Sequence, residues 1–315
     1  MTDFVFFGTS QFAIPVLETL KQNGLIPALV VSTPDKPSGR GLKPVSSPVK
    51  IWAEKNKISV VQQENLKTPA FLQKLADTKC RLVLVASYGK IIPKNILEIP
   101  KKGSLNIHPS LLPKWRGADP IRAAILAGDK KTGTTIMLMD EKMDHGPIIA
   151  QQELDIKNPE LAYLELEKTL AELGGKLLVE VIPKWLAGKI TPKEQNHELA
   201  TFTKKIKKED GHLNWNESAE IIDRKIRALN PWPGTYSFWN GKRIKILEGF
   251  SEPGSATEPG SDCLAGKVLK HNSGLAINCA SGIILIKKIQ LEGKKSQDAK
   301  DFLNGYPNII GVILN

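Results

Sequence analysis

The stretch GSLNIHP at residues 103–109 decides how the first half of this chain folds. Its short apolar run predicts a strand over residues 103–107, and the strand ends at His108 because a residue before proline is kept out of helical geometry. Alternate residues of a strand face the same side, so Asn106 and His108 point the same way. Open α/β sheets bind ligands beyond the carboxyl ends of their strands, and we expect a site there.

A second strand over residues 134–139 is followed by a loop that contains Asp144 and Gly146. We expect the two strand ends to meet, so that an amide, an imidazole and a carboxylate lie exposed in one cleft. Asn106 could donate to an oxyanion, His108 could add a donor or carry a proton, and Asp144 could orient the imidazole and accept a proton. Each residue also has an ordinary interpretation as a turn former, a cap or a solvated side chain.

The first half of the chain alternates short apolar runs with stretches of helical length. The apolar runs lie at residues 4–7, 28–31, 60–61, 82–86 and 105–107, and the helical stretches at residues 12–23, 49–56, 69–77 and 120–127. This alternation predicts an α/β domain with a mostly parallel, Rossmann-like sheet. The first turn lacks the three-glycine dinucleotide fingerprint, so we expect no NAD. A helical segment at residues 161–186, interrupted at Gly174, Gly175 and Pro183, would close the domain.

The second half has five short strands separated by Gly, Asn and Ser turns. The strands are expected at residues 236–239, 243–247, 266–269, 275–278 and 283–288, after a helix at residues 218–228. This spacing suits a small, OB-like β-barrel. A basic stretch separates the halves, and we divide the chain into a catalytic domain (1–189), a basic linker (190–209) and a C-terminal β-barrel domain (210–315).

The composition indicates a folded chain of about two domains. Its 315 residues are 41% hydrophobic, and its longest apolar runs are far shorter than a membrane span. The net charge of +11 is spread over both halves and favours a polyanionic partner. Cys80, Cys263 and Cys279 lack metal-ligand spacing, so we expect free thiols, no metal site and a cytoplasmic location.

Longer motifs around Asn106, His108 and Asp144, which we call the trio, resemble those of a known family. The runs SLNIHPSLLPKWRGADPI (104–121) and GDKKTGTTIMLMDEKMDHGPII (128–149) are similar to the signature of folate-dependent formyltransferases. The likeness extends from FVFFGTSQFAIPVLETL near the start, through DKPSGRGLKP and YGKIIPKNIL, to NPWPGTYSFWNGKRIKI in the second half. The motif at residues 115–118 and the second half resemble, within this family, the enzymes that formylate methionyl-tRNA.

The resemblance implies an activity and the residues that carry it. A formyl group would pass from N10-formyltetrahydrofolate to the amino group of initiator methionyl-tRNA, through a tetrahedral intermediate at the trio, for the initiation of translation. The implied folate pocket is formed by Ser110, Leu111, Leu112, Pro113, Val85, Ser87, Tyr88 and Gly89. The long basic loop at residues 34–43 would enter the tRNA acceptor stem with Arg40 and Lys43. A monomer without a metal ion is expected.

Basic residues outside that loop form two further groups that suit phosphates. The predicted linker contributes Lys205, Lys207 and Lys208, and the predicted barrel contributes Lys242, Arg243 and Lys245. We expect these residues to bind tRNA through its phosphates, which gives affinity rather than sequence information. The ordinary alternative is a solvated run of charges.

Two other functions remain open at this point. A folate enzyme could formylate an amine of a sugar nucleotide or a purine precursor, although the basic loop and the basic barrel favour tRNA. A non-catalytic RNA-binding protein could keep the fold, although the intact trio favours an enzyme. Folate binding separates the enzymes from the RNA-binding protein, and tRNA binding separates the two enzymes.

Overall fold

The computed structural model describes residues 4–38, 43–158, 160–252, 264–272 and 274–315. The chain divides by its internal contacts into two compact units. Unit 1 comprises Met1–Pro120, Lys131–Asp155 and Glu165–Thr203, and unit 2 comprises Ile121–Lys130, Ile156–Leu164 and Lys204–Asn315. Two short segments of the first half therefore belong to the same unit as the second half.

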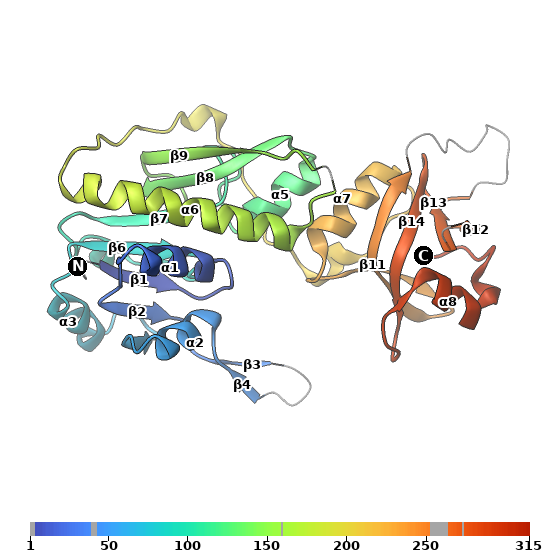
Figure 1. The fold of residues 1–315 in the computed structure, drawn as a ribbon, viewed down its shortest axis with the longest axis horizontal. Coiled ribbons are helices and arrows are strands. Elements are labelled where there is room, and N and C mark those ends of the chain that lie inside the picture. The colour runs from blue at the N-terminus through green and yellow to red at the C-terminus, as the bar shows by residue number, and fades with distance from the viewer. Residues whose placement is uncertain (1–3, 39–42, 159, 253–263, 273) are drawn as a thin grey trace. The chain divides into compact units, whose positions relative to one another are not determined.

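Seven of the described strands form the central sheet of unit 1, in the order β5-β2-β1-β6-β7-β8-β9 (Figure 1). They are β1 (Phe4–Gly8), β2 (Leu29–Ser32), β5 (Val60–Gln62), β6 (Leu82–Ala86), β7 (Ser104–His108), β8 (Lys131–Leu138) and β9 (Ile148–Asp155). Neighbouring strands pair in parallel along β5, β2, β1, β6 and β7, whereas β8 pairs antiparallel with both β7 and β9. The predicted mostly parallel, Rossmann-like sheet is thus confirmed, with β9 as an additional strand.

The helices of unit 1 begin where the local sequence permits. α2 (Pro48–Lys55) and α3 (Pro69–Asp77) each have a proline at the first helical position, where the missing N–H costs no hydrogen bond. Ser47 caps α2 by accepting the backbone N–H of Lys50 at 3.1 Å. α1 (Ala13–Gln22) and the short α4 (Lys94–Leu97) continue the alternation of strands and helices.

The alternation of side chains along the strands decides which face of the sheet carries the site. Val5 and Phe7 of β1 share a buried cluster with Phe71 of α3 and with Val85 of β6. The backbone of Val85 pairs with that of Asn106 in β7. Because paired residues of parallel strands point to the same side, Asn106 projects from the face that α3 covers.

α6 (Tyr163–Leu186) is one continuous helix beside α1 and the sheet (Figure 1). A Cβ atom on Gly174 would lie 2.7 Å from Cγ2 of Ile107, and one on Gly175 would lie 2.8 Å from Cβ of Thr19. The predicted interruption at these glycines is wrong, because they let the helix approach β7 and α1 closely. Pro183 also lies inside the helix.

Unit 2 contains an antiparallel sheet in the order β10-β11-β14-β13-β12, with β15 paired to β14. Its strands are β10 (Thr235–Trp239), β11 (Lys242–Glu252), β12 (Val268–His271), β13 (Gly274–Asn278), β14 (Ile283–Leu291) and β15 (Gln297–Asp298). The five predicted strands are confirmed. Pairing among the described strands follows an open order, so closure into an OB-like barrel stays a prediction that the sheet is compatible with.

The remaining elements are short or belong to unit 2. The helices α5 (Pro120–Ala127) and α7 (Ala219–Leu229) lie where helices were predicted or one residue away, and α8 (Ala299–Gly305) follows β15. β3 (Lys36–Ser38) and β4 (Lys43–Val45) pair on either side of residues 39–42, and 3-10 turns occur at His197–Leu199, Lys208–Gly211 and Pro307–Ile309. No helix in the described ranges has the length and apolar character needed to cross a membrane.

Candidate active site

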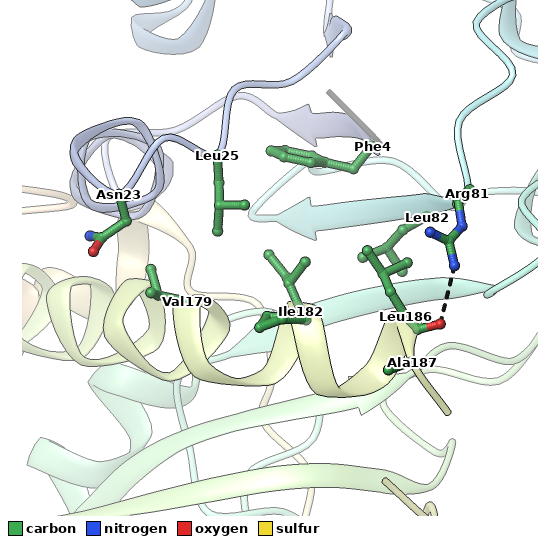
Figure 2. A pocket seen from close by; sticks show the side chains of 10 residues that line it. Phe4, Asn23, Leu25, Arg81, Leu82, Val179, Ile182, Leu186 and Ala187 are labelled. Carbon is green, nitrogen blue, oxygen red and sulfur yellow. Dashed lines mark hydrogen bonds between the residues drawn. The ribbon is translucent and has the colours of Figure 1, made fainter. Parts of the chain in front are cut away.

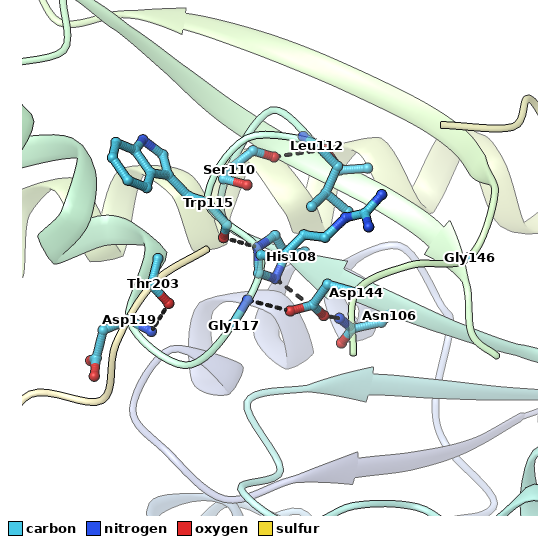
Figure 3. A network of polar contacts seen from close by, with 12 residues as sticks. Asn106, His108, Ser110, Leu112, Trp115, Gly117, Asp119, Asp144, Gly146 and Thr203 are labelled. Carbon is cyan, nitrogen blue, oxygen red and sulfur yellow. Dashed lines mark hydrogen bonds and ion pairs between the residues drawn. The ribbon is translucent and has the colours of Figure 1, made fainter. Parts of the chain in front are cut away.

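Asn106, His108 and Asp144 come together on one face of β7 (Figure 3). Ile107 contacts α6 at Gly174, so the side chains of Asn106 and His108 point to the opposite face. Nδ2 of Asn106 lies 3.5 Å from Oδ1 of Asp144, and Nδ1 of His108 lies 3.6 Å from the same oxygen. Two nitrogen atoms thus lie around one carboxylate oxygen.

Asp144 reaches this position by a different route from the predicted one. β8 runs antiparallel to β7, with Leu138 opposite Leu105. The carboxyl ends of the two strands therefore lie at opposite edges of the sheet, and the expectation that these ends meet is wrong. The loop between β8 and β9 instead folds back, and Oδ2 of Asp144 accepts the backbone N–H of Gly117 at 2.7 Å.

The orientation of His108 follows from its contact with a backbone carbonyl. Nε2 of His108 lies 2.9 Å from the carbonyl oxygen of Trp115, which can only accept, so Nε2 carries a hydrogen. Nδ1 faces Asp144 at a distance longer than a hydrogen bond. Nδ2 of Asn106 can donate to a substrate oxygen, and so can Nδ1 of His108 when the ring is protonated. The expectation that His108 is exposed is wrong, because only 4% of its surface is accessible.

Three residues around the trio have a backbone conformation that side chains disfavour. The φ angles are +48° at Ser87, +61° at Trp115 and +50° at Asp144. Left-handed residues other than glycine cost energy, and they cluster at functional sites where surrounding contacts enforce them. The turn at Trp115 presents its carbonyl to His108, and the turn at Asp144 presents its carboxylate to Gly117.

The backbone carbonyls of the Asp144 loop are held by side chains that the sequence analysis did not select. Nε2 of Gln195 donates to the carbonyl oxygens of Asp144 and Gly146, at 3.0 and 2.7 Å. Oε1 of Gln195 in turn accepts from Nη2 of Arg116 at 2.6 Å. Arg116 lies in the recognised motif and could have been singled out there. Gln195 lies in the predicted linker, where no spacing or motif marks it.

Thr201 and Thr203, also in the predicted linker, contact Arg116 through their backbone. The N–H of Arg116 donates to the carbonyl of Thr201 at 2.8 Å, and the carbonyl of Arg116 accepts from Thr203 at 2.7 Å. The side-chain oxygen of Thr203 also accepts the N–H of Asp119 (Figure 3). Residues 190–203 of the predicted linker therefore belong to unit 1 and pack beside the site.

The implied folate residues of the 110–113 segment are held in place by strands β8 and β9. Ser110 and Leu112 are buried, and Thr135 Oγ1 donates to the carbonyl of Ser110 while accepting the N–H of Leu112. Nε2 of Gln151 donates to the carbonyl of Leu112 at 2.8 Å. Leu111 contacts Gly133, and Pro113 is half-buried. The segment is therefore rigid beside the trio, and its role toward folate stays a prediction.

The implied folate residues after β6 differ in what they expose. Ser87 and Gly89 are exposed, and a Cβ atom on Gly89 would meet nothing within 4 Å. Val85 and the side chain of Tyr88 are buried, and the ring of Tyr88 packs edge-on against Phe7 at 5.2 Å. Burial raises the pKa of Tyr88 to about 12. Ser87 and Gly89 are thus the exposed part of this turn, and its role toward folate stays a prediction.

The predicted tRNA residues are distributed between the two units. Arg40 lies outside the described residues, and so does the side chain of Lys43. The others belong to unit 2, where Lys205, Lys207, Lys208, Lys242 and Arg243 are exposed and Lys245 is half-buried. The guanidinium of Arg243 lies 4.2 Å from the centre of the Tyr236 ring, and His212 stacks on that ring at 5.3 Å.

Two of the three cysteines lie among the described residues. Cys80 and Cys279 are buried free thiols, and burial raises the pKa of Cys279 to about 12. Cys263 lies outside the described residues. Within the part of the chain that the structure describes, no cluster of His, Cys, Asp or Glu side chains could hold a metal ion.

An apolar cavity of about 500 Å³ lies away from the trio (Figure 2). Phe4 and Leu82, at the amino ends of β1 and β6, line it together with Ile182 and Leu186 of α6. The guanidinium of Arg81 donates to the carbonyl of Leu186 at 3.1 Å at its rim. This cavity contains none of the predicted site residues.

Comparison with known proteins decides the family. Residues 2–182 match the formyl transferase family, and residues 205–307 match the formyl transferase C-terminal domain. The chain belongs to the formyl transferase family. The methionyl-tRNA formyltransferase of Thermus thermophilus is 42% identical over 96% of this chain and 95% of its own length. That of Syntrophomonas wolfei is 40% identical over 98% of both chains. The resemblance found in the motifs is confirmed.

Solved structures show that the fold of this formyl transferase is shared by distant proteins. The methionyl-tRNA formyltransferase from Clostridium thermocellum matches with a TM-score of 0.56 and 19% identity over 81% of this chain and 95% of its own. HypX from Aquifex aeolicus, solved in complex with tetrahydrofolic acid, matches with a TM-score of 0.64 and 15% identity. The match covers 98% of this chain and 48% of HypX. At these identities the likeness concerns the fold alone.

Proposed function

We propose that this chain transfers the formyl group of N10-formyltetrahydrofolate to the amino group of initiator methionyl-tRNA. The observation that carries this proposal is the convergence of Asn106 and His108 on Asp144 within a member of the formyl transferase family. Relatives named methionyl-tRNA formyltransferase support it, because they are about 40% identical over nearly the whole chain.

The three side chains supply the groups that formyl transfer needs. Nδ2 of Asn106 donates to the formyl oxygen as negative charge develops there, the kind of stabilisation that contributes most in acyl transfer. His108, when protonated, adds a donor at Nδ1 and a positive charge, and it gives its proton to N10 as the bond between N10 and the formyl carbon breaks. Asp144 accepts the proton that the attacking amine must lose, and its hydrogen bond from Gly117 holds it in position.

The residues beside the trio fit a folate donor as co-substrate. The exposed backbone of Ser87 and Gly89 would contact its pterin, and the rigid 110–113 segment would line the other side. When bound, the donor supplies a formyl carbon attached to N10. Because the segment is fixed by Thr135 and Gln151, little ordering free energy is lost on binding.

Positive charge supports tRNA as the second substrate. Lys205, Lys207 and Lys208 are exposed at the start of the segment Lys204–Asn315 of unit 2, and Lys242 and Arg243 are exposed on β11. We assign these residues to tRNA phosphates, together with Lys245, Arg40 and Lys43. The catalytic domain at 1–189, the linker at 190–209 and the tRNA-binding domain at 210–315 belong to the same proposal, as do a cytoplasmic location and a monomeric state.

A formylation assay with two kinds of acceptor tests the proposal. Charged initiator tRNA is incubated with the protein and N10-formyltetrahydrofolate, and formylated and free aminoacyl-tRNA are separated on an acid gel. We expect formylation of methionyl-tRNA and none of an amino-sugar nucleotide. Formylation of the sugar alone would assign the chain to the other folate enzymes, and tRNA binding without any formylation would assign it to the non-catalytic RNA-binding proteins.

A further inference from the structure

Four side chains form a continuous network behind Asp144, which we name the bracing network: Gln195, Arg116, His197 and His145. Its hydrogen bond to Asp144 is made to the backbone carbonyl of that residue. The network joins the loop between β8 and β9 to residues 195–197, which are about fifty residues away in sequence.

Gln195 is the centre of the bracing network. Its side chain is buried, with 5% of the residue exposed, and its amide makes four hydrogen bonds. Nε2 uses both hydrogens on the carbonyls of Asp144 and Gly146, and Oε1 accepts Nε and Nη2 of Arg116 at 3.2 and 2.6 Å. A primary amide can donate two hydrogens and accept two, so Gln195 is fully satisfied and has one preferred orientation.

Arg116 fixes the amide of Gln195 from the other side. Only 3% of Arg116 is exposed, and its Nη2 also lies 2.8 Å from Nδ1 of His197. A guanidinium can only donate, so Nδ1 of His197 must accept and carry no hydrogen. The contact therefore exists only while the His197 ring is neutral, because a proton on Nδ1 would face the cation directly.

His197 stacks on His145 at the outer end of the network. The ring centres are 4.1 Å apart and the planes differ by 6°. His145 and Asp140 both lie in the Asp144 loop, where Nδ1 of His145 donates to Oδ2 of Asp140 at 2.6 Å, so the ring stack joins His197 to that loop. The charged groups that act on His197 are Arg116, His145, Glu194 and Lys142.

We propose that Gln195 and Arg116 are positioning residues that hold Asp144 for formyl transfer, and that protonation of His197 loosens them. This inference rests on the function proposed above. It follows from the chain of contacts, since Asp144 sits in a left-handed turn whose carbonyl is fixed by Gln195. A shift of about 1 Å in a reacting group can lower turnover by roughly a hundredfold.

The direction of the pH dependence follows from the surroundings of His197. Packing of the ring and then the positive charges of His145 and Arg116 hold the pKa of His197 below its ordinary value of 6.5. The neutral ring, and with it the bracing network, is therefore intact at neutral pH. In the unfolded chain the ring binds its proton at the ordinary value, so the contribution to stability is complete above that value and declines as the pH falls toward the lowered pKa.

The first test replaces Gln195 by glutamate. Gln195→Glu keeps an acceptor for Arg116, so the chain should fold, but it cannot donate to the carbonyls of Asp144 and Gly146. We expect kcat to fall at least tenfold while KM for both substrates changes little, and the Tm to fall because two carbonyls lose their donor. Gln152→Glu, at an exposed position of β9, is the matched control and should behave as wild type. Wild-type kcat in Gln195→Glu would overturn the positioning role.

The second test separates the proton on His197 from its hydrogen bond. His197→Asn offers an amide oxygen to Arg116 but cannot be protonated, and His271→Asn is the control. We expect kcat of His197→Asn to persist to lower pH than kcat of wild type. An identical acid limb in both proteins would overturn the role of His197.

A spectroscopic readout keeps this inference separate from the proposed function. In wild type, the side-chain NMR signals of Arg116 Nε–H and the Gln195 amide should shift together as His197 titrates, and in His197→Asn they should not. This holds whichever amine the enzyme formylates. Signals that do not shift as His197 titrates would disprove the bracing network. Signals that do shift, in a protein unable to formylate methionyl-tRNA, would disprove only the proposed substrate.

Discussion

The carbonyl oxygen of Trp115 accepts a hydrogen bond from Nε2 of His108 at 2.9 Å. Because this bond occupies one ring nitrogen, any second proton on His108 must reside on Nδ1, on the side of Asp144. The second N–H of the charged histidine can then donate only toward the space shared with Asn106. This geometry leads to specific expectations for the trio.

Removing any member of the trio should lower kcat by roughly a hundredfold or more, as expected when oxyanion donors or proton-transfer groups are removed. The variants are Asn106→Ala, His108→Ala and Asp144→Ala, measured by formylation of methionyl-tRNA. His108→Ala should also lower the free energy of unfolding by about 1–3 kcal/mol, since the half-buried carbonyl of Trp115 loses its donor. Near-normal turnover of Asn106→Ala would remove the oxyanion role from that residue.

Gly146 should tolerate no side chain. A Cβ atom there would lie 1.9 Å from the carbonyl oxygen of Leu138, so Gly146→Ala must displace the backbone that carries Asp144. We expect a decrease of about 1–3 kcal/mol in stability by denaturant unfolding, together with reduced kcat. Gly305→Ala is the matched control, because a Cβ atom at Gly305 meets nothing within 4 Å. Equal stabilities of the two variants would show that the loop relaxes freely.

The lysines at the start of the segment Lys204–Asn315 of unit 2 should act through charge. Replacing Lys207 and Lys208 together by alanine should weaken tRNA binding and leave folate binding unchanged. For each lysine that no longer neutralises a phosphate, the log–log dependence of affinity on salt should flatten by about one unit. The double variant of the exposed Lys294 and Lys295 has the same change in charge and serves as control. If both double variants keep the wild-type slope, Lys207 and Lys208 are only solvated.

Arg40→Leu should cripple formylation of methionyl-tRNA and spare binding of the folate donor. Glycines at 39 and 41 permit close approach to nucleic acid, and arginine offers a planar fork to phosphates or base edges. Arg40→Lys should restore activity only in part, because lysine supplies charge without that geometry. Steady-state kinetics with each substrate varied in turn provide the measurement. Unchanged tRNA kinetics in Arg40→Leu would contradict this role.

The fold could be predicted from sequence where local pattern and burial agree. β1 and β6 are apolar throughout because both of their faces are covered, and α3 starts and ends at the predicted residues. The direction of β8 could not be predicted in this way. The residue pattern of a buried strand does not distinguish parallel from antiparallel pairing. That the Asp144 loop folds back toward His108 is therefore seen only in the structure.

The site was predictable only for residues that a motif marks. Asn106 and His108 are two apart on one strand, so their common direction follows from strand geometry. Gln195 is polar, lies near Pro192 and charged residues, and is buried only because Arg116 and the Asp144 loop surround it. Burial that depends on partners so far away in sequence leaves no local signal.

The separation of Gln195 from the trio has a consequence for the order in which the enzyme matures. A ribosome delivers Asn106, His108 and Asp144 well before residue 195, and the amino-terminal sheet can begin to fold as soon as its strands emerge. During that interval the loop that carries Asp144 lacks the amide that fixes its carbonyl groups. Catalytic competence therefore arrives as a late event of synthesis, after a long chain closure has brought residue 195 back to the sheet.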